Sequence, residues 1–169
     1  MKDVTLRALE SFPQRLEQHF AAIPAGFENW APSSWEGVPS EPFTAIEQIC
    51  HVRDIEVDGY LVRFRRTLEE NDPVLPALDG ETLARQRRYA ASDALEVLAA
   101  FQAARARTLA LIAALRPEQL ARTATFEGYG RVSLASLIHY LCSHDQQHLA
   151  GLQWLLGKIE ASRPGRGGS

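Results

Sequence analysis

The sequence has little of two features that would place it in a specialised class of protein. It holds two cysteines among 169 residues, so no network of disulfides can hold the fold together. Both cysteines, Cys50 and Cys142, lie in apolar stretches of helical character, which predicts buried free thiols and suits a reducing cytoplasm. No apolar run approaches the ~18 residues of a membrane span, and the N-terminus lacks an apolar core of signal-peptide length. We therefore expect a cytoplasmic protein that has no membrane partner.

The sequence also lacks a strong net charge. Lysine and arginine number 18 and aspartate and glutamate 21, for a formal charge of −3, which gives no electrostatic reason to expect a nucleic-acid partner. Arginines do cluster at two places along the chain, with acidic residues near them: Arg63, Arg65 and Arg66, then Arg85, Arg87 and Arg88. This pattern favours solvated helix faces that carry ion pairs.

The sequence does contain four long stretches of helical periodicity, and apolar residues make up 46% of it. The stretches cover residues 3–23, 44–68, 93–115 and 133–157. Four helices of this length without a convincing strand predict an all-α fold, a four-helix bundle. We place this bundle in a single domain, residues 1–160, followed by a tail, residues 161–169, that has no core-forming residue and is expected to be disordered.

Local signals mark where these helices begin and end. Pro13 predicts either a kink in the first helix or a turn before a helix that starts next to it. Thr44 and Glu47 stand in a capping-box relation at the start of the second helix. Ser133 is predicted to be the N-cap and Gly157 the C-cap of the last one.

Two connections are long. Residues 24–42 hold four prolines, and we expect Trp30 and Trp35 to pack onto one end of the bundle. Residues 117–132 form another connection with a glycine-marked turn. Between the second and third helices the chain includes a short predicted helix, residues 81–89.

Histidine spacing on the last helix is the first sign of chemistry. His144 and His148 stand four residues apart, so both imidazoles lie on one face of the helix and can reach one ion. The same face carries small or apolar residues, as an inward face requires: Leu137, Tyr140, Leu141 and Gly151. At ~100° per residue, His139 lies on roughly the opposite side and is not a ligand candidate.

His51 adds a third imidazole. It lies in mid-helix among isoleucines, where a lone buried histidine would need partners. Three imidazoles and a water complete a tetrahedral site with an open position, the arrangement of catalytic zinc. On spacing and burial alone, ordinary helix histidines remain an equal alternative. His19 has no spaced partner and is expected at the surface.

Several carboxylates lie near the histidines in sequence. Glu47, Asp54 and Asp58 are one or two turns from His51, where they could accept a hydrogen bond from an imidazole or could be solvated at the bundle end. Asp145 points ~80° away from the histidine pair. We find no fourth protein ligand at suitable spacing, which counts against a purely structural ion.

The segments around these histidines, QICHVRD at residues 48–54 and LIHYLCSHDQQHL at residues 137–149, resemble the DinB-like (DinB/YfiT) metalloprotein superfamily. The loop with tryptophans and prolines and the long connection after the second helix resemble it too. The resemblance implies a bundle with a long crossover connection and a metal triad at His51, His144 and His148. It also implies zinc or nickel as the one divalent metal ion, and a homodimer.

The resemblance further implies a metal-dependent thiol S-transferase that uses a low-molecular-weight thiol such as bacillithiol or mycothiol as a small-molecule substrate. Two alternatives remain: a metal-dependent hydrolase, and a non-enzymatic metal-binding or stress-response interaction module. No carboxylate is clearly aimed at the metal in the sequence. Since hydrolases commonly recruit one as general base, this favours thiol chemistry.

Overall fold

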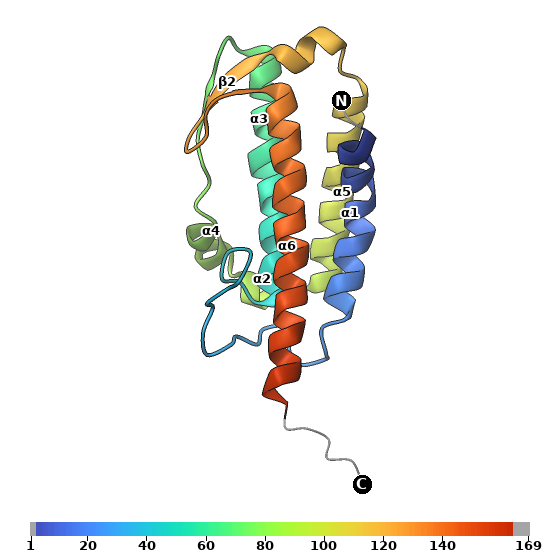
Figure 1. Ribbon diagram of the computed structural model, residues 1–169, viewed down its shortest axis with the longest axis vertical. Coiled ribbons are helices and arrows are strands. Elements are labelled where there is room, and N and C mark those ends of the chain that lie inside the picture. The colour runs from blue at the N-terminus through green and yellow to red at the C-terminus, as the bar shows by residue number, and fades with distance from the viewer. Residues whose placement is uncertain (1–2, 164–169) are drawn as a thin grey trace.

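Four long helical segments form the molecule in the computed structural model, which describes residues 3–163 (Figure 1). They are α1 (Asp3–Ala21), the continuous run of α2 (Ala45–Asp54), η1 (Ile55–Tyr60) and α3 (Leu61–Glu69), then α5 (Ala94–Ala113) and α6 (Leu134–Ser162). The six residues of η1 form a π-helical turn between the two α-helical halves of the second segment. The predicted all-α four-helix bundle is confirmed.

The direction of the helices requires one long crossover. In the view of Figure 1, α1 and α6 run downward, whereas the α2–α3 segment and α5 both run upward. Because these two parallel segments follow one another in sequence, the chain must return along the bundle between them. It does so through β1 (Val74–Leu75), α4 (Gly80–Arg87) and η2 (Tyr89–Ala91), which confirms the predicted crossover connection.

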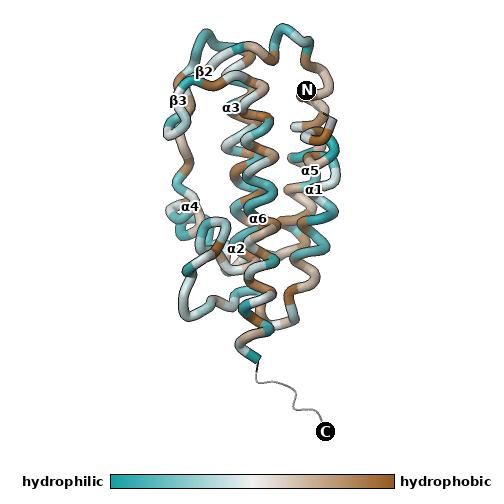
Figure 2. The backbone as a smooth tube through the Cα atoms, in the orientation of Figure 1, coloured by the Kyte–Doolittle hydropathy of each residue, from teal (hydrophilic) through white to brown (hydrophobic). Residues whose placement is uncertain are grey.

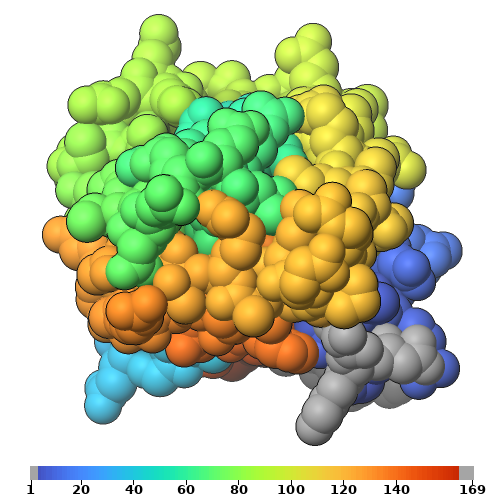
Figure 3. Space-filling view, turned by 90° about the horizontal axis from the view of Figure 1, so that it is seen from above, coloured from blue at the N-terminus to red at the C-terminus, as the bar shows by residue number. Residues whose placement is uncertain are grey.

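A small sheet lies at the upper end of the bundle, so the prediction of a chain without strands is wrong. β1 pairs in parallel with β2 (Thr123–Phe126), and β2 pairs antiparallel with β3 (Gly130–Ser133). Strands of two and four residues are too short to show a period of two in the sequence. The sheet and η3 (Pro117–Ala121) cover this end, as the view from above shows (Figure 3).

Apolar and polar residues alternate along each helix of the bundle (Figure 2). The buried apolar side chains form two clusters, one in the lower half around Phe12, Ile49 and Leu152 and one in the upper half around Phe64 and Leu137. This alternation is typical of helices that pack one face into an apolar core and expose the other to solvent. None of the helices in residues 3–163 has the length and apolar character needed to cross a membrane.

The helix ends agree with some local signals and not with others. The backbone N–H of Thr44 donates to Glu47 Oε2 over 2.9 Å, as the predicted capping box requires. α1 continues through Pro13, so the turn considered there does not form. α6 also continues past Gly157 to Ser162, because Ile159 still packs into the core. The predicted C-cap is therefore wrong.

The tail predicted for residues 161–169 begins within α6, which ends at Ser162. Residues 164–169 lie outside the part of the chain that the structure describes.

The loop before α2 follows the predictions, and the two cysteines follow them except that Cys142 is not fully buried. Trp35 stacks on Trp154 with ring centroids 5.9 Å apart, and Trp30 packs against the lower apolar cluster. Both cysteines are free, Cys50 buried and Cys142 half-buried, and burial raises the pKa of each thiol. Neither has the depressed pKa of a reactive cysteine.

Candidate metal centre

The three histidines selected by spacing converge in the bundle. His51 extends from α2, and His144 and His148 extend from successive turns of α6. The Nε2 atom of His144 lies 3.3 Å from that of His51 and 3.1 Å from that of His148. His51 is 2% exposed and His148 is fully buried. Three ring nitrogens thus face one point that bulk water barely reaches.

A carboxylate that the sequence did not reveal completes this cluster. Glu41 Oε1 lies 3.5 Å from His51 Nε2, and Glu41 Oε2 lies 3.4 Å from His148 Nε2. One potential ligand atom from each of the four residues lies within 4.8 Å of all the others. The expectation that no fourth ligand and no carboxylate faces the centre is therefore wrong. Glu41 was missed because it lies in the loop before α2, where no periodicity places it.

The three imidazoles fit a divalent ion, with the Glu41 carboxylate beside them. Ligand nitrogens around a tetrahedral zinc at Zn–N distances of about 2.0–2.1 Å stand about 3.3 Å apart, close to the separations seen here. Burial, with the charge of His51, lowers the pKa of His144 to about 3, and burial lowers that of His148 well below its usual value. Both imidazoles are therefore neutral at physiological pH, as metal ligands must be.

Glu41 keeps its negative charge in this setting. Burial opposes ionisation, but the hydrogen bond and the positive charge offered by His51 lower the pKa of Glu41 to about 2. The neutral imidazoles of His144 and His148 beside this ionised carboxylate offer nitrogen and oxygen donors, which suit borderline divalent metals.

Gln48 contacts both His148 and the loop that carries Glu41. Its Oε1 accepts a hydrogen bond from His148 Nδ1, which places the proton on that nitrogen and leaves Nε2 free to face the centre. Its amide Nε2 donates to Ser40 Oγ over 2.8 Å and to the Phe43 carbonyl over 3.3 Å. One buried side chain thereby links His148 to the loop that carries Glu41.

Two glycines allow other segments to approach the cluster. A Cβ at Gly80, the first residue of α4, would stand 2.7 Å from His51 Cε1 and 2.9 Å from its Nδ1. A Cβ at Gly151 on α6 would stand 2.9 Å from Gln48 Nε2. Real Cβ atoms do not approach other atoms this closely, so the crossover and the loop can pack here because these positions lack a side chain.

The carboxylates considered as imidazole partners from sequence have other partners. Asp54 accepts from Tyr89 Oη over 2.6 Å and pairs with Arg87 Nη1 over 2.8 Å. Asp58 pairs with the same Arg87 nitrogen, and Glu47 caps α2. None of the three bonds a histidine, so that interpretation is wrong. Gln48, three residues before His51, takes this role for His148.

The remaining histidines lie away from the centre. His139 is exposed, and its Nδ1 is 3.0 Å from Thr5 Oγ1. His19 bonds the Arg15 carbonyl one turn earlier on α1. Asp145, next to His144 in sequence, bonds Arg105 instead of facing the histidines.

The histidine cluster opens onto a cavity of about 150 Å³. Its further walls include Tyr60 and Arg63 from the second helical segment and Phe126 and Tyr129 from the small sheet and its turn. Arg63 is 5% exposed, which contradicts the prediction of a solvated arginine at this position. Arg66 and Arg87 do form ion pairs near the surface, as predicted for the two arginine clusters.

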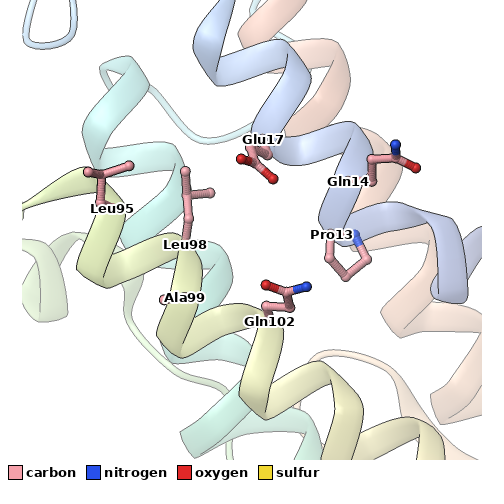
Figure 4. A pocket seen from close by; sticks show the side chains of 7 residues that line it. All are labelled: Pro13, Gln14, Glu17, Leu95, Leu98, Ala99 and Gln102. Carbon is pink, nitrogen blue, oxygen red and sulfur yellow. The ribbon is translucent and has the colours of Figure 1, made fainter.

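A larger depression of about 390 Å³ lies elsewhere, between α1 and α5 (Figure 4). Pro13, Gln14 and Glu17 line it from one helix. The opposite wall comes from α5 and consists of Leu95, Leu98, Ala99 and Gln102. It contains no histidine or cysteine and no convergent set of titratable groups, so we assign the functional site to the histidine cluster.

Comparison with known proteins agrees with this fold. A family model of the DinB superfamily matches residues 8–152. The solved structure described as "YfiT from Bacillus subtilis is a probable metal-dependent hydrolase with an unusual four-helix bundle topology" superposes with a TM-score of 0.80 at 21% sequence identity. The match covers 94% of this chain and 87% of the YfiT chain, and at this identity it shows the fold. Among curated proteins, none matches the chain significantly.

Proposed function

The chain belongs to the DinB superfamily, and from that premise we propose that it is a metal-dependent enzyme in which His51, His144 and His148 hold one divalent ion. The observation that carries the proposal is the convergence of three Nε2 atoms: that of His144 lies 3.3 Å from that of His51 and 3.1 Å from that of His148. Burial keeps two of these imidazoles, those of His144 and His148, neutral. Neutral imidazole nitrogens held this close together and away from water are poorly stabilised without a cation at their centre.

Zinc or nickel suits this donor set, because imidazole nitrogens bind both. A divalent ion held there would act as a Lewis acid that lowers the pKa of a water or thiol nucleophile. Gln48 maintains the ligating tautomer of His148, and Gly80 leaves room for the His51 ring.

Glu41 gives the site a group that can take up a proton, and for this reason we favour hydrolysis as the reaction. Its carboxylate lies within 3.5 Å of two of the imidazoles, and the residue is partly exposed. A carboxylate at this distance can accept the proton that a water molecule loses as it attacks a substrate carbonyl or similar centre. It returns that proton to the leaving group. The solved YfiT structure, described as a probable metal-dependent hydrolase, is consistent with this reaction.

Transfer of a low-molecular-weight thiol, such as bacillithiol, is the second candidate. The observation in its favour is Arg63, whose positive charge lines the same cavity as His51 and His144. A nearby cation stabilises a thiolate, which is the nucleophilic form of a thiol. In this reaction Glu41 would accept the thiol proton, and the sulfur would form a bond to an electrophilic carbon of a second small molecule as the bond from that carbon to its leaving group breaks. Glu41 would then return the proton to the departing group.

One assay on two substrate sets separates the candidates. Metal-loaded protein is incubated with a panel of esters and amides, and separately with an alkylating electrophile and a panel of cellular thiols. We expect metal-dependent hydrolysis that falls by about 10²–10⁴-fold in Glu41→Gln while bound metal is retained. Glu36→Gln, an exposed position in the same loop, is the matched control and is expected to keep the wild-type rate.

Metal-dependent conjugation without hydrolysis would favour the thiol S-transferase. No metal-dependent rate in either assay would contradict an enzymatic role and favour the non-enzymatic metal-binding or interaction module. The homodimer and the cytoplasmic location stay predictions.

A further inference from the structure

Arg63 is a buried arginine without a carboxylate partner. Its side chain lies between two aromatic rings, with the guanidinium carbon 4.4 Å from the Phe126 centroid and 5.1 Å from that of Tyr60. Nη2 donates to the Pro76 carbonyl over 3.2 Å, and Nε has no hydrogen-bond partner. Within residues 3–163 no aspartate or glutamate lies within ion-pair distance of Arg63.

A cation in this position is costly for the fold. Taking a guanidinium out of water without an opposing charge is unfavourable, and aromatic faces return part of that loss. Burial accordingly lowers the pKa of Arg63, although the residue stays charged. Side chains held in such a state usually serve a ligand rather than the fold.

The π-helical turn explains how Arg63 comes to share the cavity with the histidines. Along an uninterrupted α-helix at ~100° per residue, Arg63 would be turned about 120° away from His51. The six residues of η1 lie between His51 and Arg63. A π-helical turn winds through a smaller angle per residue than an α-helix does. Both side chains therefore line the same cavity, together with His144.

We propose that Arg63 binds an anionic group of the substrate, a carboxylate or a group of similar charge, while the reacting part of the same molecule lies at the histidine cluster. The placement of the reacting part at the histidine cluster rests on the proposed function, whereas the binding of an anion by Arg63 does not. The cavity of about 150 Å³ fits a small organic anion. Its aromatic walls suit the apolar part of such a molecule, and the guanidinium of Arg63, which lines the cavity without a carboxylate partner, supplies the positive charge for its charged end.

Calorimetric titration with benzoate and with its neutral analogue benzamide tests the proposal. Both are titrated into metal-free and metal-loaded protein at low salt. We expect benzoate to bind both forms, and Arg63→Met to weaken that binding by at least about tenfold. Benzamide should bind Arg63→Met and wild type alike. Arg65→Met removes the same charge from an exposed position on the same helix and should leave benzoate binding unchanged.

Thermal melting of the metal-free variants separates a ligand-binding arginine from a structural one. If Arg63 serves a ligand, Arg63→Met melts at or above the wild-type temperature, because an unpaired buried charge has been removed. A lower melting temperature would assign Arg63 to the fold and overturn the proposal. Arg63→Lys keeps the charge and is expected to bind benzoate more weakly than wild type and more tightly than Arg63→Met.

Other outcomes are equally decisive. Equal benzoate affinity in wild type and Arg63→Met overturns the proposal and leaves the metal centre unaffected. If wild type retains no metal but binds benzoate through Arg63, the proposed function fails while the anion site stands. Bound metal is measured on every variant so that the two failures are distinguished.

Discussion

Two polar regions lie inside the same bundle, the histidine cluster and a network around Arg105. Two consecutive residues of α6 contribute one side chain to each. His144 faces the histidine cluster, whereas Asp145 faces Arg105. Arg105, 1% exposed, donates from both sides of its guanidinium to Glu56 and Asp145 at 2.8–3.0 Å, and to the Leu9 carbonyl at 3.1 Å. Every N–H of this guanidinium has a partner.

The histidine region lacks this completeness. His51 Nδ1 and Arg63 Nε are buried without hydrogen-bond partners, and three Nε2 atoms face one another. A buried polar network whose members are all paired stabilises and specifies a core, whereas one with free donors and acceptors is suited to a ligand. The comparison therefore assigns the network of Arg105, Glu56 and Asp145 to the fold and the histidine region to function.

The largest effect is expected at Arg105. Arg105→Met leaves Glu56 and Asp145 buried without their cation, and we expect the free energy of unfolding of the metal-free protein to fall by about 3–5 kcal/mol. Urea unfolding followed by circular dichroism measures it. Arg107→Met, at an exposed position on the same helix, should change the value by less than about 0.5 kcal/mol. A loss as small as that for Arg105→Met would remove the contrast between the two regions.

The next effect is the acid sensitivity of the metal-free protein. The pKa of His144 is about 3 in the folded protein and about 6.5 in an ordinary setting, and that of His148 is lowered in the same direction. Below pH 6.5 the unfolded chain thus binds protons that the folded one does not, so stability falls as the pH falls toward 3. Each such histidine contributes about 1.4 kcal/mol per pH unit.

Urea unfolding at several pH values, with the metal removed, measures this slope. His148→Gln should reduce the slope by the contribution of one histidine, about 1.4 kcal/mol per pH unit. His139→Gln, at an exposed position on the same helix, should leave the slope unchanged. A slope that is the same in all three proteins would show that the buried histidines are not the source of the acid sensitivity.

Gln48 offers a test of the histidine region that leaves every proposed ligand in place. Gln48→Ala removes the acceptor for His148 Nδ1 and the link to the loop of Glu41. We expect zinc affinity to fall by about 10–100-fold, in a competition titration with a chromophoric chelator. Gln147→Ala, an exposed neighbour of His148, is the control. Unchanged affinity in Gln48→Ala would contradict the positioning role.

The smallest effects are expected at two glycines. A Cβ at Gly80 collides with the His51 ring, so Gly80→Ala should weaken zinc binding by less than Gln48→Ala does. A Cβ at Gly157 meets nothing within 4 Å, so Gly157→Ala should raise the free energy of unfolding by about 0.5–1 kcal/mol and leave zinc binding unchanged. The same chelator titration and urea unfolding measure both. Equal zinc affinity in Gly80→Ala and wild type would show that His51 has room to move.

Helical periodicity was enough to predict four helices and the shared face of His144 and His148, because these signals are local to one helix. That His51 joins them was left at even odds by spacing and burial, and the family resemblance then favoured it. The four-residue spacing of His144 and His148 alone defines a shared face. The strands could not be predicted in this way, because they are short and because β1 pairs with a strand distant in sequence.

Glu41 and Arg63 were missed for two different physical reasons. Glu41 reaches the cluster through the path of a proline-containing loop, which has no period from which a direction can be deduced. Arg63 lies beyond a π-helical turn, so the angle deduced from an ideal α-helix is wrong for it. Gln48 did carry a signal, since it lies three residues before His51 and on nearly the same face of the helix.

The most direct test of the account is the metal content of the purified protein and of four single variants. Mass spectrometry with an inductively coupled plasma source should find about one divalent ion per chain in the wild type and in His139→Ala. His51→Ala, His144→Ala and His148→Ala should each lose most of it, while circular dichroism shows that they remain helical. Full metal content in these three variants, or none in the wild type after refolding with zinc or nickel, would contradict the metal centre.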